Sequence, residues 1–345
     1  MMNFEKFLTE NFKTTSEGIY TGTKSGYWSN LSMNENTAML KKLQEHTCNE
    51  VIRNTYPQLE EIIFSPKRHT GLPLLEMTNN DICIDYGCMW GALTIPLAKK
   101  TAHVFAVDQT LESILFLKAR LREEKINNVS LICNDIRTMP EIPSNLRPNI
   151  AIVNGVLEWV PETGVIELKS FWGKQEKRIY SGNPKKKQVD FLKNVLLNLK
   201  SGGKLYLAIE NRYDFRMFLG EVDPHSGIPF TSILPRFLAN IESKILLKRP
   251  YLSWIYSFEE IRNILLKDVG FTKVDLYACF PHYHFPQNIV PYSKKNIPFT
   301  PSISVRNDRG KIKLKRMVGR SLEYLFFNFK GAHFFSPSII ALAYK

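Results

Sequence analysis

Long apolar runs are missing from this 345-residue sequence, and so are the cysteine patterns that mark many metal centres. No stretch reaches the roughly 18 consecutive apolar residues that a membrane-spanning helix requires. The five cysteines are odd in number and lack Cys-x-x-Cys spacing, which favours reduced thiols and argues against a bound metal. The first residues include Glu5 and Glu10 and lack the apolar segment of a secretion signal. We therefore expect a cytoplasmic protein that holds no metal.

Acidic residues are in the minority, since 46 Lys and Arg against 33 Asp and Glu give a net charge of +13. A positive surface attracts nucleic acid, anionic lipid or a phosphorylated substrate. A lysine-rich surface that is merely solvated explains the same composition. Peripheral contact with the inner face of a membrane is therefore one option among several. The basic residues gather in four segments, which are Lys174–Arg178, Lys185–Lys187, Lys244–Arg249 and Lys311–Arg320.

The most informative stretch is Asp81–Gly91. Its apolar run Ile82–Ile84 predicts a short strand buried on both faces, and Asp85 stands where that strand ends. Gly87 and Gly91 then predict a tight turn that leads into a helix. A strand, a glycine turn and a helix start form a corner at which backbone N–H groups bind nucleotides and other anions. Ordinary turn chemistry explains the stretch nearly as well, because only two glycines are present.

Three further apolar segments follow, and each is succeeded by a polar side chain. In an open parallel sheet the carboxyl ends of the strands form the edge that binds ligands. A carboxylate after the second strand suits a ribose, because it accepts hydrogen bonds from both hydroxyl groups. The spacing therefore predicts an α/β core that binds a nucleotide-like ligand. The segments are His103–Val107, followed by Asp108; Val129–Cys133, followed by Asn134 and Asp135; and Ile150–Val153, followed by Asn154.

These motifs resemble those of the class I S-adenosylmethionine-dependent methyltransferases. Residues 85–91 are similar to the first motif of that family, Val107-Asp108 to the second and Asn134-Asp135 to the third. The resemblance implies a Rossmann-like sheet of seven strands with helices on both faces, and S-adenosylmethionine (SAM) as the cofactor. Met89 stands where the family usually has a glycine, and its side chain is expected to crowd the methionine moiety of the cofactor. The cofactor-binding residues that the resemblance implies are Asp85, Gly87, Gly91, Asp108, Asp135 and Asn154.

Later segments extend this core. The fifth strand is expected at Lys204–Ile209, the sixth at Phe271–Phe280, and the last, Ser338–Tyr344, antiparallel between them. The polar, lysine-rich stretch Thr163–Lys187 predicts a loop or lid, and Pro281–Asn307 predicts a second loop over the pocket. Four parts are therefore expected along the chain: a helical cap (1–64), the cofactor-binding core (65–212), an insertion that builds the acceptor site (213–256), and the C-terminal part of the sheet with its loop and basic helices (257–345).

Transfer of a methyl group to an alcohol needs a base that takes the hydroxyl proton. Glu210 follows the fifth strand, and Asp223 and His225 flank a proline that fixes a sharp turn. We expect His225, assisted by Glu210 or Asp223, to handle this proton. His282 and His284 are weaker candidates in the loop after the sixth strand. Each candidate has a structural alternative, namely an ion pair of Glu210 with a neighbouring arginine, an Asp-capped turn, or the ordinary polarity of a loop.

A second resemblance is to a bacterial methyltransferase subfamily whose genes often lie in clusters for surface-polysaccharide and O-antigen synthesis. By association it implies O-methylation of a sugar hydroxyl on a glycan, a nucleotide sugar or a lipid-linked saccharide. An RNA methyltransferase is an alternative, but only the net charge favours it, so nucleic acid is not the expected partner. A degenerate fold that binds a ligand without catalysis is a further alternative, suggested by Met89. The segments that carry the resemblance are Asn154–Trp159, Tyr206–Arg212, Asp223–Ser232 and Leu234–Arg236.

Overall fold

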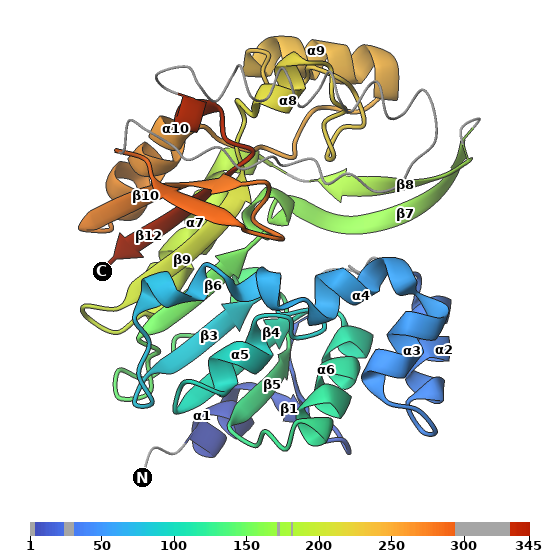
Figure 1. Cartoon of the computed structure of the whole chain (residues 1–345), viewed down its shortest axis with the longest axis vertical. Coiled ribbons are helices and arrows are strands. Elements are labelled where there is room, and N and C mark those ends of the chain that lie inside the picture. Colours follow the sequence, from blue (N-terminus) through green and yellow to red (C-terminus); the bar gives the residue numbers. More distant parts are fainter. Residues whose placement is uncertain (1–3, 24–30, 171–172, 181, 294–331) are drawn as a thin grey trace.

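Ten strands form one mixed sheet in the order β1-β2-β5-β4-β3-β6-β9-β12-β10-β11 (Figure 1). The computed structural model describes residues 4–23, 31–170, 173–180, 182–293 and 332–345. The expected α/β, Rossmann-like architecture is confirmed. The strands of this sheet are β1 (Lys13–Thr14), β2 (Tyr20–Thr21), β3 (Ile82–Tyr86), β4 (His103–Asp108), β5 (Val129–Cys133), β6 (Ile150–Asn154), β9 (Lys204–Glu210), β10 (Lys273–Phe280), β11 (Asn288–Pro291) and β12 (Ser338–Tyr344).

The centre of the sheet is parallel, as its apolar strands predict. β5, β4, β3, β6 and β9 run parallel, and every residue of β3 is buried. β12 lies antiparallel between β9 and β10, with Ser338 opposite Glu210 and Tyr344 opposite Lys204. The last strand therefore has its predicted place. The sheet is wider than the seven strands expected, because β1 and β2 extend one edge and β11 extends the other; strands this short leave no periodic signal in the sequence.

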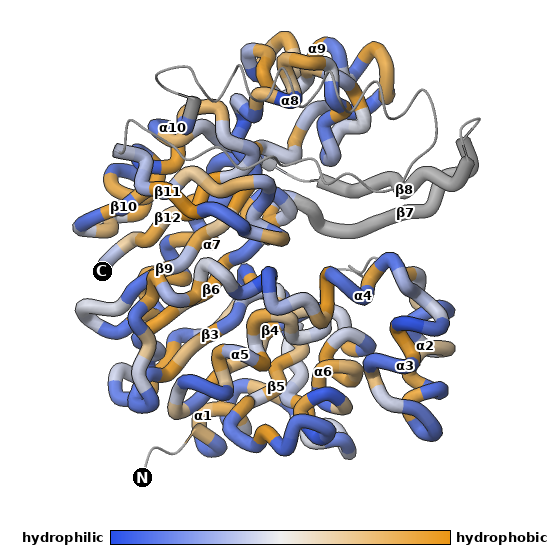
Figure 2. The backbone as a smooth tube through the Cα atoms, in the orientation of Figure 1, coloured by the Kyte–Doolittle hydropathy of each residue, from blue (hydrophilic) through white to orange (hydrophobic). Residues whose placement is uncertain are grey.

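Helices cover both faces of the sheet, because alternate residues of a strand point to opposite sides. Ile84 packs with Phe191 on one face, whereas Cys83 packs with Leu97 on the other. Apolar residues accordingly concentrate along the strands and the helix faces turned toward them (Figure 2). The α-helices of the described residues are α1 (Phe4–Asn11), α2 (Met33–Lys42), α3 (Cys48–Thr55), α4 (Pro57–Phe64), α5 (Thr94–Ala98), α6 (Leu111–Glu123), α7 (Pro184–Asn198), α8 (Phe215–Phe218), α9 (Arg236–Leu247) and α10 (Phe258–Asn263).

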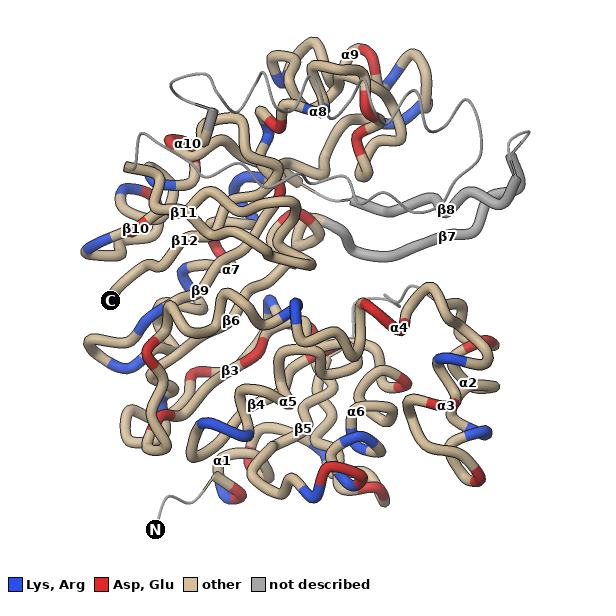
Figure 3. Tube along the Cα trace, viewed as in Figure 1, with Lys and Arg blue, Asp and Glu red and all other residues tan. Residues whose placement is uncertain are grey.

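Short helical segments connect several of these elements. No helix of the described residues is both long and apolar enough to cross a membrane. Charged residues lie mainly on the helices and connecting loops (Figure 3). The short segments are η1 (Pro66–His69), η2 (Leu72–Leu75), η3 (Ile136–Thr138), η4 (Leu157–Trp159), the π-helical η5 (Ile264–Val269) and η6 (Ala332–Phe335).

The N-terminal region is helical over most of its length, as predicted. Helices α2 and α3 each begin with a capping box, in which Ser32 and Thr47 exchange hydrogen bonds with the glutamate three residues later. Met39 and Ile52 pack with Phe116 of α6, so α2 to α4 lie against a helix that covers the sheet. The part that departs from the helical expectation is the β1–β2 pair, in which β2 runs parallel to β5.

The expectation of a loop over residues 163–187 is wrong, because this segment forms strands and the start of a helix, whereas its role as a lid stays a prediction. β7 (Glu162–Ser170) and β8 (Gly173–Tyr180) form an antiparallel hairpin, which curves away from the main sheet (Figure 1). α7 then begins at Pro184, where the missing N–H of proline costs nothing, and Asn183 caps it. Polar composition suggested a loop, but the two strands of a hairpin satisfy each other's backbone hydrogen bonds without an apolar pattern in the sequence. The basic segment Lys311–Arg320 lies outside the described residues.

The chain between β9 and β10 carries two helices. α8 is a single turn capped by Asp214, and α9 lies within the residues expected to form the insertion. α10 follows and begins with a capping box of Ser257 and Glu260. Beyond β10, residues 288–291 form β11, so this part of the expected loop is an edge strand.

Candidate active site

The turn between β3 and α5 contains three residues with positive φ, which are Gly87 (75°), Met89 (43°) and Gly91 (78°). A Cβ on Gly87 would lie 2.6 Å from a methyl carbon of Val156. A Cβ on Gly91 would lie 2.2 Å from Cδ1 of Leu117 on α6. Two constraints therefore favour glycine at both positions: the backbone is left-handed, and a neighbouring side chain occupies the space that a Cβ would need.

Met89 holds a backbone conformation that favours glycine, at the position where the sequence departs from the family pattern. Its N–H donates to Oδ2 of Asp108 at 2.9 Å, which ties the turn to the end of β4. Its side chain lines the adjoining cavity. The turn therefore accommodates a side chain at this point with local backbone strain. Whether that side chain crowds a bound cofactor stays a prediction.

A cavity of about 330 Å³ lies at the carboxyl edge of the parallel strands, within the range of small-molecule sites, about 300–1,000 Å³. Gly91 does not line it but supports the turn from behind, against α6. Ile62 and Ile63 of α4 form part of its wall, so the N-terminal helices cover one side of it. The other five residues expected to bind the cofactor do line the cavity: Asp85, Gly87, Asp108, Asp135 and Asn154.

Two of these acids, Asp85 and Asp108, are buried carboxylates. Oδ2 of Asp85 accepts a hydrogen bond from the Thr94 hydroxyl at 2.7 Å. Asp108 accepts backbone N–H groups of Met89 at 2.9 Å and Thr110 at 2.8 Å. Burial raises the pKa of each carboxyl to about 6, against the opposing effect of these hydrogen bonds. A ligand that donates hydrogen bonds to the two carboxylates would offset the cost of burying their charge.

Asp135 forms an ion pair with Arg137, a residue to which the sequence analysis gave no role. Arg137 binds its carboxylate with Nε at 2.9 Å and Nη2 at 2.6 Å, and both residues line the cavity. A second arginine of the lining, Arg68, was also missed. Nε and Nη1 of Arg68 are buried without a hydrogen-bond partner among the described residues. Its guanidinium could hold an anionic group such as the carboxylate of SAM; no local motif marks it, because it lies before β3 in a turn.

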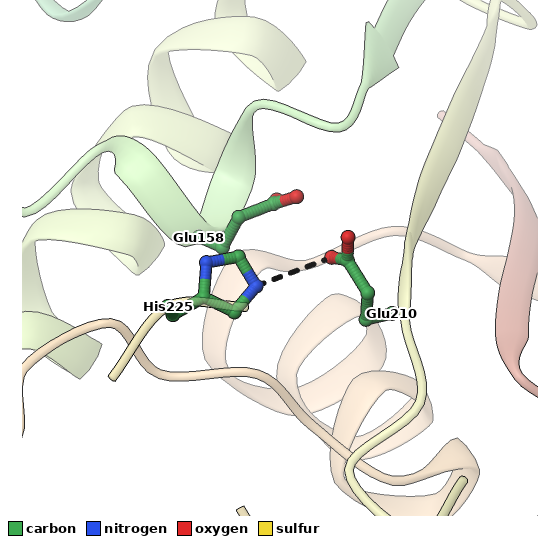
Figure 4. Close-up of side chains that lie close together, drawn as sticks. All are labelled: Glu158, Glu210 and His225. Atoms are coloured by element: carbon green, nitrogen blue, oxygen red, sulfur yellow. Dashed lines mark ion pairs between the residues drawn. The ribbon is translucent and has the colours of Figure 1, made fainter. Parts of the chain in front are cut away.

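Glu210 and His225 line the cavity, and Glu158 lies beside them. Glu210 ends β9, Glu158 comes from η4, and His225 comes from the turn after α8. Nε2 of His225 lies 3.5 Å from Oε2 of Glu210, and the rings of His225 and Trp159 meet edge to face at 4.7 Å. Figure 4 shows the imidazole directed at the Glu210 carboxylate, with Glu158 close to both. The structure therefore brings together Glu210 and His225, which the sequence proposed as partners.

Glu158 and Glu210 differ in charge although they lie side by side. Complete burial, together with the charge of Glu210, raises the pKa of Glu158 well above its usual range. Burial also acts to raise the pKa of Glu210, but His225, His282 and Glu158 outweigh it and hold that pKa well below its usual range. The Tyr283 hydroxyl lies 3.3 Å from Glu158 and 3.2 Å from Glu210. The shared proton of this pair therefore belongs to Glu158, and the negative charge to Glu210.

The other candidates have different surroundings. Asp223 does not line the cavity; its carboxylate accepts the His225 N–H at 2.9 Å and the Tyr251 hydroxyl at 3.2 Å, so it anchors the turn that carries His225. His282 lies 3.6 Å from Glu210, and burial lowers its pKa to about 4. His284 stacks on His282 at 4.6 Å and lines the cavity. Both histidines are neutral at pH 7 and are placed to support Glu210.

In the described part of the chain, Glu158, Glu210 and His225 are the one group of acids, histidines and cysteines whose ligand atoms come close enough for a metal ion, within 4.8 Å of one another. Carboxylate and imidazole ligands suit a hard divalent cation. Such an ion would have to displace the proton from Glu158. Glu158 itself had no role in the sequence-based prediction, because nothing local shows that it meets Glu210.

Comparisons with known proteins agree with this geometry. Residues 77–222 match a family model described as a methyltransferase domain, a span that runs from before β3 to the loop after α8. A search of curated proteins finds no match. Among solved structures, similar folds include a putative methyltransferase from Bacillus halodurans, with 13% identity, 81% of this chain and 98% of that chain covered, and a TM-score of 0.42.

Two other solved structures are similar at the same level. A SAM-dependent methyltransferase from Methanosarcina mazei shares 14% identity over 80% of this chain and 97% of that chain, with a TM-score of 0.42. A phosphoethanolamine N-methyltransferase from Haemonchus contortus shares 14% identity over 91% of this chain and 53% of that chain, with a TM-score of 0.41. Likenesses this distant carry no argument about the substrate.

The glycine turn, the carboxylates at the strand ends and the matched family model define a class I SAM-dependent methyltransferase domain. The protein is accordingly a SAM-dependent methyltransferase, and SAM is its cofactor.

Substitution of Gly91 tests the turn. Gly91→Ala should destabilise the protein more than Gly202→Ala, because both glycines have positive φ but nothing lies within 4 Å of a Cβ on Gly202. We expect a loss of roughly 1–2 kcal/mol from strain alone at Gly202 and about 1–3 kcal/mol more from overpacking at Gly91. Urea denaturation of both variants measures the difference, and equal losses would contradict the crowding against α6.

Substitution of Asp108 tests the cofactor site. Asp108→Ala should weaken SAM binding by about 1.5–3 kcal/mol, because charge-assisted hydrogen bonds to the ligand are lost. Isothermal titration calorimetry measures the affinity, with Asp275→Ala, an acid of β10 outside the cavity lining, as the control. Unchanged affinity in Asp108→Ala would remove this carboxylate from the cofactor site.

Cofactor affinity should also depend on pH. With pKa values of about 6, Asp85 and Asp108 lose their charge as the pH falls from 7.5 to 5, so SAM binding should weaken over this interval. The stability of the unliganded protein should change in the opposite sense. Because these carboxyl groups have a higher pKa in the folded state than in the unfolded state, the free energy of unfolding falls as the pH rises from about 4 to 6. Calorimetry at several pH values tests the first effect; a flat profile would contradict it.

Proposed function

We propose that the protein transfers the methyl group of SAM to a hydroxyl group of a saccharide, carried on a glycan, a nucleotide sugar or a lipid. The observation that carries this proposal is the Glu210–His225 pair at the edge of the cofactor cavity. An alcohol must lose its proton as it attacks, so its methylation gains from a base, whereas a neutral amine attacks without one. A buried carboxylate–imidazole pair is therefore more useful to a hydroxyl acceptor.

When bound, SAM supplies a methyl group activated by its positively charged sulfur. The acceptor hydroxyl gives its proton to His225, and the ionised Glu210 at 3.5 Å stabilises the imidazolium that forms. Asp85, Asp108 and Asn154, which line the same cavity, would hold SAM beside this pair. The neutral Glu158 and the Tyr283 hydroxyl hold the Glu210 carboxylate in place. Asp223 keeps His225 at the cavity through its backbone N–H.

Several features support a saccharide as the acceptor. Trp159 and Tyr283 bring aromatic surface to the same wall as Asn154 and Glu210. Aromatic faces pack against the apolar faces of sugar rings, while side-chain amides and carboxylates bind their hydroxyl groups. The resemblance of residues 205–236 to the polysaccharide-associated methyltransferases points to the same class of acceptor. Arg68 and Arg137 add positive charge that suits a phosphorylated carrier.

Replacement of His225 tests the proposed base. His225→Ala should lower turnover by about 10²–10⁴-fold, the usual contribution of a general base, while SAM affinity stays unchanged. Transfer of a labelled methyl group from SAM to a panel of nucleotide sugars and lipid-linked saccharides measures turnover. His103→Ala is the control, because His103 lies on β4 beside Ser130 and does not line the cavity.

The same assay separates the remaining possibilities. Full turnover in His225→Ala with loss in Glu210→Gln would make Glu210 the base. Loss of wild-type turnover in a metal chelator, restored by Mg²⁺, would show that Glu158, Glu210 and His225 hold an ion instead. Label recovered on nitrogen or in RNA, and none on saccharide oxygen, would contradict the proposed acceptor.

A further inference from the structure

Exposed apolar side chains are concentrated in one part of the molecule. Eleven large hydrophobic residues of the described chain are exposed, and all but Met33 and Leu197 lie between residues 218 and 246. Monomeric proteins rarely leave a large apolar patch uncovered unless it contacts a partner or a membrane. We call these nine side chains the α8–α9 surface: Phe218, Leu219, Val222, Phe230, Phe237, Leu238, Ile241, Ile245 and Leu246.

α9 shows the reverse of the usual pattern of a surface helix. Its buried positions, Ala239 and Ser243, are small or polar. Its apolar residues Phe237, Ile241 and Ile245 follow one another at intervals of four and have exposed fractions of 65%, 50% and 63%. Residues with this spacing form one stripe along a helix. Because the stripe faces outward, packing within the chain does not explain it.

The α8–α9 surface is continuous with the loop beside it. The chain forms a bridge between Val222 and Pro229, and the Thr231 hydroxyl donates to Glu242 of α9 at 2.8 Å. α8 and α9 lie together at one end of the molecule, far from the N-terminus (Figure 1). Side chains from the helix and the loop can therefore meet one flat partner.

Positive charge borders this apolar stripe. Lys244 and Lys248 are exposed on and just after α9, and Arg249 follows them. The acid of the helix, Glu242, is half-buried and bonded to Thr231. The acid of the α8 loop, Glu221, lies 3.7 Å from Arg216. An outward apolar stripe flanked by lysines and by no unpaired acid is typical of a helix that lies in the plane of a membrane surface.

We infer that the α8–α9 surface binds an anionic lipid bilayer, with α9 lying in the headgroup region. A second copy of the chain fits less well, because two such surfaces would bring Lys244 and Lys248 against their own counterparts. Residues 294–331, which lie outside the described chain, are also strongly basic and would meet the same repulsion. Anionic headgroups satisfy both the apolar and the cationic part of the surface.

Docking of this kind would bring the active site to the membrane. The segment that carries the α8–α9 surface also supplies Pro224 and His225 to the cavity lining. A lipid-linked acceptor could then enter the cavity from the bilayer. The inference does not depend on the proposed reaction, because it rests on exposure and charge at a surface outside the cavity.

Vesicle flotation of the full chain tests this inference. Wild-type protein should float with phosphatidylcholine vesicles that contain about 30% phosphatidylglycerol and bind much less to phosphatidylcholine alone. Ile241→Glu/Ile245→Glu should abolish flotation, because charge replaces the centre of the apolar stripe. Lys244→Gln/Lys248→Gln should reduce binding on the order of tenfold, and high salt should have the same effect.

The matched control is Met33→Glu/Leu197→Glu, which adds the same charge at the two exposed apolar residues outside the surface and should float like the wild type. SAM binding, measured on every preparation, reports that each variant is folded and separates a docking defect from a failure of the methyltransferase site. The inference is overturned if wild type does not bind anionic vesicles, or if Ile241→Glu/Ile245→Glu binds them normally. It is also overturned if α9 variants instead abolish self-association or RNA binding.

Discussion

Burial of carboxyl groups at one edge of a parallel sheet is the constraint on which this site depends. Because β3, β4 and β9 run in the same direction, the acids that end them, Asp85, Asp108 and Glu210, meet at one edge. An uncompensated buried carboxylate is costly. Each carboxylate has a different partner in the fold. Asp85 accepts the Thr94 hydroxyl, Asp108 accepts backbone N–H groups that include that of Met89 in the turn, and Glu210 lies beside the imidazole of His225.

These partners leave the site incomplete in a way that matches its chemistry. Asp85 and Asp108 keep raised pKa values, so a ligand rich in hydrogen-bond donors gains from binding them. At the acceptor side, Glu158 takes up the proton that Glu210 gives up, and one negative charge remains beside His225. Asp85 and Asp108 thus favour the binding of a ligand that donates hydrogen bonds, and the Glu210–His225 pair favours the uptake of a proton.

Much of the core and of the cofactor cavity could be predicted from local patterns in the sequence. The run Ile82–Ile84, the glycine turn and the polar strand ends are set by neighbouring residues, so the core strands and the residues lining the cofactor cavity could be predicted. The pairing of Glu158 with Glu210 could not, because 52 positions separate them and the fold alone brings both to the Tyr283 hydroxyl. Arg68 was missed for the same reason, and the hairpin β7–β8 was misjudged because its polar residues resemble a loop.

The most direct test is calorimetric titration of the purified protein with SAM and with its demethylated product. The account predicts one site per chain and a dissociation constant of about 1 μM, roughly −8 kcal/mol. Such binding would show that the turn accommodates both Met89 and the cofactor. No binding of either compound, in protein shown to be folded, would contradict the account, because Met89 would then close the cavity that the rest of the mechanism requires.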